Sequence, residues 1–169
     1  MPISMYRASI PIFLQMLPAL SGVLDKGLAF AAAKKVEPSV LLNSRLAPDM
    51  FPLIRQVQLA SDFAKSVAAR LAGQEPPKFP DTEATFDELK ARIAKTLAYL
   101  KEFKVSQIDG SEEKDITITL GGQPRSFKGE NYLIGFGLPN FFFHVTTAYA
   151  ILRHNGVDIG KGDYMRPPG

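Results

Sequence analysis

From Tyr6 to Leu28, an apolar residue recurs every three or four positions. This spacing puts the apolar side chains on one face of an α-helix, so the segment predicts a long amphipathic helix with one face in a core. Ser4 can cap this helix. Pro11 and Pro18 fall inside it and would bend it; alternatively, the helix begins after Pro11. The apolar stripe consists of Tyr6, Ile10, Phe13, Leu17, Leu20, Leu24 and Leu28.

A second helix is expected over residues 49–72. Asp49 can cap its start, Pro52 suits its first turn, and Gly73 can end it. Its apolar positions again follow helical spacing, which predicts a second core-facing element. The inward candidates are Ile54, Val57, Phe63, Val67 and Leu71.

A third helix is expected from residue 86 to about residue 104. Thr85 and Glu88 stand at the spacing of a capping box, in which each side chain bonds to the other's backbone N–H. Apolar residues follow at helical spacing and predict the buried face. We expect the opposite face to be solvated and to carry the four cations Lys90, Arg92, Lys95 and Lys101.

The period changes after the third helix. Residues 116–120 alternate between Ile or Leu and Thr, as in a strand. Gly121 and Gly122 can adopt the positive φ of a tight turn, and residues 125–128 would form the returning strand. This pattern predicts a β-hairpin. Because an isolated hairpin is only marginally stable in water, it should lie against the helices or a partner chain. Residues 129–138 are expected to form a glycine-containing loop.

A fourth helix is expected to start at Pro139 and to end at Asn155 and Gly156, with Val157 making an apolar contact beyond the end. Residues 158–169 are expected to be a polar tail. Four amphipathic helices with one inserted hairpin predict an all-α fold, a four-helix bundle with a small β-hairpin before the last helix. We expect one domain over residues 1–169.

Composition limits the functions that are open to this chain. It has 169 residues and no cysteine, which excludes disulfides, thiolate nucleophiles and cysteine-bound zinc. The net charge is +3, but Lys and Arg alternate with Asp and Glu, so no nucleic-acid-binding surface is indicated. No signal-peptide pattern and no membrane-spanning run of apolar residues is evident. The expectation is a soluble cytoplasmic protein.

Several segments resemble a known family. They include Arg-Leu-Ala-Pro-Asp-Met-Phe-Pro at 45–52, Leu-Pro-Asn-Phe-Phe-Phe-His at 138–144, and residues 56–58, 62–65, 69–73 and 148–157. These segments resemble the DUF1993 family of uncharacterised bacterial proteins over essentially the whole chain. The resemblance implies the DinB/YfiT-like superfamily, whose members are four-helix bundles, often homodimeric. Several are metal-dependent enzymes or thiol-dependent transferases.

The resemblance also implies where a metal site would lie. The superfamily takes one histidine from the second helix and a His-x-x-x-His pair from the last. His144 matches the second position of that pair, Asn140 occupies the first, and the second-helix position falls at or near Gln56 or Gln58. Amide oxygens are poor substitutes for imidazole toward zinc or nickel. His154 stands about 15 Å further along the helix and cannot join His144 on one metal.

These residues predict a pocket with a degraded metal site. The pocket candidates are His144, Asn140, Gln56, Gln58 and Asp62. The expected function is a homodimeric bundle protein that binds a small molecule near His144, without a cofactor, although His144 can equally be a buried structural histidine. One alternative is a metal-dependent hydrolase or thiol-dependent transferase that uses His144 with zinc or nickel. Another is a structural module with the hairpin and residues 141–143 as its dimer contact.

Overall fold

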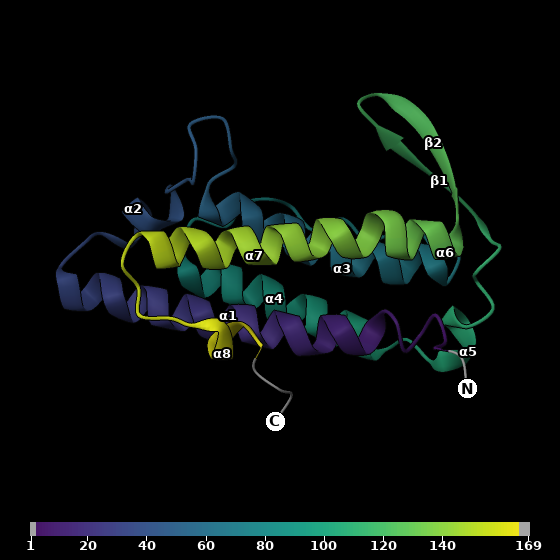
Figure 1. Cartoon of the computed structure of the whole chain (residues 1–169), viewed down its shortest axis with the longest axis horizontal. Helices are drawn as coiled ribbons and strands as arrows, with labels where there is room; N and C mark the ends of the chain where they lie inside the picture. Colours follow the sequence, from purple (N-terminus) through teal and green to yellow (C-terminus); the bar gives the residue numbers. More distant parts are fainter. Residues whose placement is uncertain (1–2, 166–169) are drawn as a thin grey trace.

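The computed structural model describes residues 3–165 and contains four long helices, which lie side by side in a bundle (Figure 1). Helix α3 contacts both α7 and α4, and α1 contacts α4 and α7. The expected all-α bundle is therefore confirmed, including the hairpin before the last helix. The four helices are α1 (Ile10–Lys34), α3 (Leu53–Leu71), α4 (Phe86–Lys101) and α7 (Leu138–His154).

Short elements connect the long helices. Their bounds are α2 (Pro38–Leu42), α5 (Val105–Ile108), β1 (Asp115–Leu120), β2 (Gln123–Lys128), α6 (Gly129–Tyr132), the π-helical turn η1 (Leu133–Gly137) and α8 (Lys161–Tyr164). The loop expected over residues 129–138 is wrong, because α6 and η1 lead directly into α7. The tail expected from residue 158 is partly wrong too, since Ile159 is buried and α8 follows it; residues 166–169 lie outside the described part.

The helix ends follow local chemistry, with two corrections. Helix α1 begins at Ile10, so Pro11 stands in its first turn, where the missing N–H costs nothing. The Ser4 hydroxyl accepts from the N–H of Arg7 in a turn before this helix, and Ser4 is not its cap. Helix α3 begins after Pro52, not after Asp49, because the chain enters it in an extended conformation. The capping box before α4 is confirmed.

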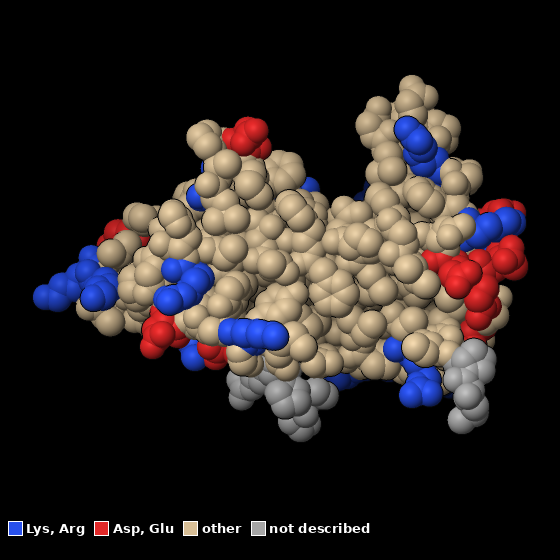
Figure 2. All heavy atoms as spheres, in the orientation of Figure 1, with Lys and Arg blue, Asp and Glu red and all other residues tan. Residues whose placement is uncertain are grey.

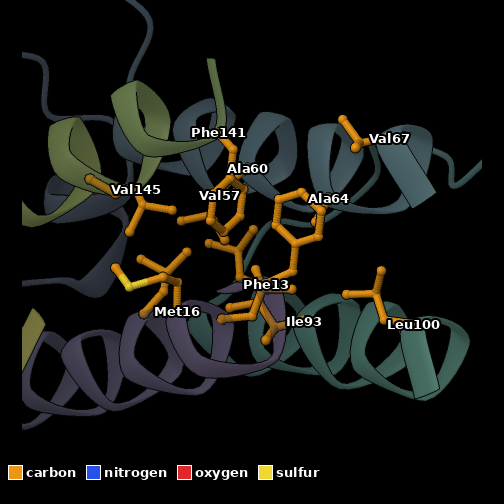
Figure 3. Close-up of a cluster of buried hydrophobic side chains, with 14 of the residues drawn as sticks. Phe13, Met16, Val57, Ala60, Ala64, Val67, Ile93, Leu100, Phe141 and Val145 are labelled. Atoms are coloured by element: carbon orange, nitrogen blue, oxygen red, sulfur yellow. The ribbon is translucent and has the colours of Figure 1, made fainter. Parts of the chain in front are cut away.

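The core lies along the axis of the bundle, and all four long helices contribute to it (Figure 3). The rings of Phe13 from α1 and Phe141 from α7 meet edge to face, with centroids 4.8 Å apart. Helix α1 is the one described helix that is long and apolar enough to cross a membrane. A core helix passes the same test, and in this fold its apolar face packs inside the bundle.

The hairpin projects from one end of the bundle, beside α6 (Figure 1). Its turn is made by Gly121 and Gly122 with φ of 56° and 79°, as a tight hairpin turn requires. On β1, Ile116 and Ile118 are only 5% and 7% exposed, so this strand packs against the helical core. Nearly all of β2 is exposed to solvent.

Candidate functional site

His144 and Gln56 form a buried hydrogen-bonded pair between α7 and α3. His144 is 8% exposed, and its Nδ1 lies 2.7 Å from Oε1 of Gln56. The Gln56 amide is itself oriented, because its Nε2 donates to the backbone oxygen of Phe51 at 3.0 Å. The amide oxygen therefore faces the imidazole and accepts a hydrogen bond from Nδ1–H. This arrangement leaves Nε2 of His144 as the unprotonated nitrogen.

Aromatic rings surround the imidazole. Phe63 stacks on it with ring centroids 5.5 Å apart, and Phe143 meets it edge on at 5.3 Å. Burial, together with the smaller effect of the positive charge of Arg55, lowers the pKa of His144 to about 4. The imidazole is thus neutral near pH 7. A base with so low a pKa removes protons poorly near neutrality.

The residues around His144 do not fit the metal site that the superfamily implies. Asn140 lies one turn before His144 and donates from Nδ2 to the backbone oxygen of Phe136 at 2.7 Å. Gln56 already donates to Phe51 and accepts from His144. Over residues 3–165, no three His, Cys, Asp or Glu side chains gather closely enough to hold a metal ion. One imidazole with two committed amides gives too few donors for zinc or nickel.

The other two pocket candidates belong to a separate cluster, around Arg92. Gln58 donates from Nε2 to Glu83 at 2.9 Å, and Asp62 accepts from Nη2 of Arg92 at 2.8 Å. Asp62 also pairs with Lys65. The sequence candidates thus divide into a His144–Gln56 pair, with Asn140 one turn away, and a charged cluster that contains Gln58 and Asp62.

Arg92 was expected on the solvated face of α4, and this expectation is wrong. Its side chain is 1% exposed and reaches Asp62, Asp81 and Glu83 at 2.8, 3.0 and 3.0 Å. It also donates to the backbone oxygen of Pro80 at 3.1 Å. Burial lowers the pKa of Arg92, but the three carboxylates outweigh this effect and raise it, so the guanidinium stays charged. Arg92 thereby holds the 80–83 segment against α3 and α4.

A groove of about 360 Å³ lies between α3, strand β1 and η1. Gly137 lets η1 approach α3 closely, because a Cβ there would lie 2.5 Å from Cγ2 of Val67. Phe63 joins the groove to the His144 pair, since its ring both lines the groove and stacks on the imidazole. The lining residues are Leu59, Asp62, Phe63, Ser66, Arg70, Ile118, Thr119, Leu120 and Phe136.

Arg70 is the functional candidate in this groove that the sequence did not reveal. Its Nη1 donates to the hydroxyl of Tyr132 at 3.0 Å, and Tyr132 is fully buried. Burial raises the pKa of Tyr132, although Arg70 pulls it the other way, so the phenol remains neutral. Within residues 3–165, no carboxylate lies within ion-pair distance of Arg70. The α3 sequence alone gives no sign of this, because the groove's other walls are distant in the chain.

Comparison with known proteins places the chain in a family. The family described as "Domain of unknown function (DUF1993)" matches residues 5–165. No curated protein matches the chain. The chain is similar to a DinB family member protein from Shewanella denitrificans whose crystal structure is known. The two sequences are 46% identical and the two structures match with a TM-score of 0.88. The match covers 96% of this chain and 92% of that chain. The chain belongs to the DUF1993 family and has a DinB-like helical fold.

Proposed function

We propose that the protein binds a small molecule in the groove between α3, β1 and η1. The observation that carries this proposal is the groove itself, about 360 Å³ in volume, where known ligand sites occupy roughly 300–1,000 Å³. Its walls combine apolar and aromatic side chains with a few polar groups, the composition typical of such sites. The apolar members are Leu59, Phe63, Ile118, Leu120 and Phe136.

The proposed binding function requires no reaction at His144, which lies beside the groove, and the contacts and pKa of its imidazole agree with this. The imidazole is stacked on Phe63, it donates to Gln56, and its pKa is lowered to about 4. A hydrolase or transferase of the superfamily's kind needs a metal or a base that works near neutrality. Neither is supplied by this donor set, so we assign His144 to holding Phe63 and the α3–α7 contact.

Ser66→Trp is expected to fill the groove and to weaken fragment binding by roughly tenfold or more, because the indole takes the ligand's place. Methyl NMR of Ile118 and Leu120 during titration with a panel of small amphipathic fragments measures this effect. Ala94→Trp, at an exposed position on α4, is the control and should bind like the wild type. The proposal fails if no fragment shifts these methyl signals, or if Ser66→Trp leaves all of the shifts unchanged.

We also propose that the protein forms a homodimer through the outer face of α7. Residues 131–152 contain no Lys, Arg, Asp or Glu. Ile134 and Phe143 on this stretch are 56% and 54% exposed. Figure 2 shows that the surface over α7, between the hairpin and the loop before α3, carries few charged side chains. Depletion of charge around exposed aromatics is characteristic of interface cores.

Phe143→Asp is expected to turn a dimer into a monomer, because it places a charge where the two chains would exclude water. Light scattering at micromolar concentration measures the mass. Val105→Asp is the matched control, because Val105 on α5 is 52% exposed, nearly the same fraction as Phe143. Val105 lies outside the uncharged stretch. A monomeric wild type, or dissociation by Val105→Asp alone, would refute this dimer face.

A further inference from the structure

Arg70 stands where three hollows of the surface meet. It lines the groove described above. It also lines a pocket along β1 with Lys114 and Thr117, and a third pocket that residues 75–81 line as well. The groove is mainly apolar, whereas the pocket along β1 is lined largely by polar side chains. A molecule seated across this junction would therefore meet apolar surface on one side of Arg70 and polar surface on the other.

No acidic side chain among residues 3–165 pairs with Arg70, although several lie near it. Asp62 lines the same groove, but Arg92 and Lys65 already pair with it. Asp115 lines the pocket along β1 and pairs with Lys128 at 2.8 Å. Glu75 lines two of the hollows and is not within ion-pair distance of Arg70. The cation that remains available to a ligand in the groove is thus Arg70.

We infer that the ligand is an amphipathic oxyanion, with a carboxylate or phosphate group at Arg70 and an apolar body against Phe63, Phe136 and Leu120. This inference rests on the proposed function, because it names the class of molecule that the groove takes. The rings of Phe63 and Phe136 meet edge to face at 5.8 Å and form an aromatic wall for the body of the ligand.

The geometry of Arg70 suits this role. Tyr132 holds one of its nitrogens, Nη1, so part of the side-chain ordering is already present before a ligand arrives. The planar guanidinium has further N–H donors, which can bind two oxygens of a carboxylate or phosphate side by side. A neutral ligand of the same shape would lose these charged hydrogen bonds.

Matched ligands test the inference on the unmodified protein. We would compare 4-phenylbutyrate, 2-phenylethyl phosphate and the neutral 4-phenylbutan-1-ol by calorimetry and by the methyl signals of Ile118 and Leu120. At least one of the two anions should bind roughly tenfold or more tightly than the alcohol. The tighter anion identifies carboxylate or phosphate as the head group. The preference should weaken as salt is added, because an exposed charge pair is screened.

Arg70→Met should remove the preference for the anions, and Arg70→Lys should keep part of it, because a point charge remains without the planar fork. Arg7→Met removes the same charge at an exposed site and should change nothing. If the alcohol binds as tightly as both anions, this inference is overturned while the proposed groove stands. If neither the anions, the alcohol nor any neutral fragment binds there, the proposed function fails with it.

Discussion

Arg92→Met is expected to lower the free energy of unfolding by about 3–5 kcal/mol, the range for breaking a buried ion pair by removing one partner. The guanidinium is 1% exposed and pairs with Glu83, which is itself only 12% exposed. It also pairs with Asp62 and Asp81, which Lys65 and Arg55 contact as well. Methionine fills much of the same volume but donates no hydrogen bond. The Glu83 carboxylate would then be left nearly buried without its cation, and the 80–83 segment would lose its anchor.

Urea denaturation followed by circular dichroism measures this loss. Arg7→Met is the matched control, because it makes the same replacement at an exposed position, where changes usually stay within about 0.5 kcal/mol. A loss below about 1 kcal/mol for Arg92→Met, similar to that of the control, would show that water or a rearranged lysine compensates the carboxylates. The assignment of Arg92 as the anchor of this segment would then be wrong.

The arrangement of Arg92 shows where sequence reasoning reached its limit. The four cations of α4 look like one solvated face, but Arg92 lies three residues after Leu89 and four before Thr96, and both of these are buried. That spacing places it on the inward edge of the helix. The signal was therefore present, but the acids that make burial tolerable come from α3 and from the 80–83 segment.

Glycine misled the prediction between the hairpin and α7. Gly129, Gly135 and Gly137 suggested a loop, yet the chain is helical there. At Gly129, a Cβ would lie 1.9 Å from the backbone oxygen of Ser111, so this glycine allows two segments to touch. The four main helices, the hairpin turn and the α4 cap were predictable because their signals are local. Close approaches between distant segments leave no such pattern.

The candidate site shows the same division. His144 and Gln56 were both identified, and the structure brings them together across 88 positions of sequence. The groove was not foreseen, because its walls come from three separate stretches: residues 59–70, 118–120 and 136. None of these stretches has a motif of its own. What makes Arg70 a candidate is the absence of an acidic partner nearby in the described fold, which is a property of tertiary structure.

His144 is expected to make the free energy of unfolding depend on pH. Its pKa is about 4 in the folded protein, against an ordinary value of 6.5. Well above pH 6.5 the imidazole is neutral in both the folded and the unfolded chain, so it adds no pH dependence. Between pH 6.5 and 4 the unfolded chain binds a proton that the folded chain excludes. The free energy of unfolding therefore decreases as the pH is lowered through this range. The total loss is about 3 kcal/mol, and it levels off below pH 4.

His144→Gln isolates this effect from the titration of carboxylates, which the variant shares with the wild type. Urea unfolding at a series of pH values should show a shallower decline between pH 6.5 and 4 for His144→Gln, even if that variant is less stable at pH 7. His154→Gln removes the other histidine, which is exposed at the end of α7, and should keep the wild-type slope. Equal slopes for His144→Gln and the wild type would mean that the folded imidazole takes up its proton as readily as the unfolded one. The buried, Gln56-bonded neutral state of His144 would then be excluded.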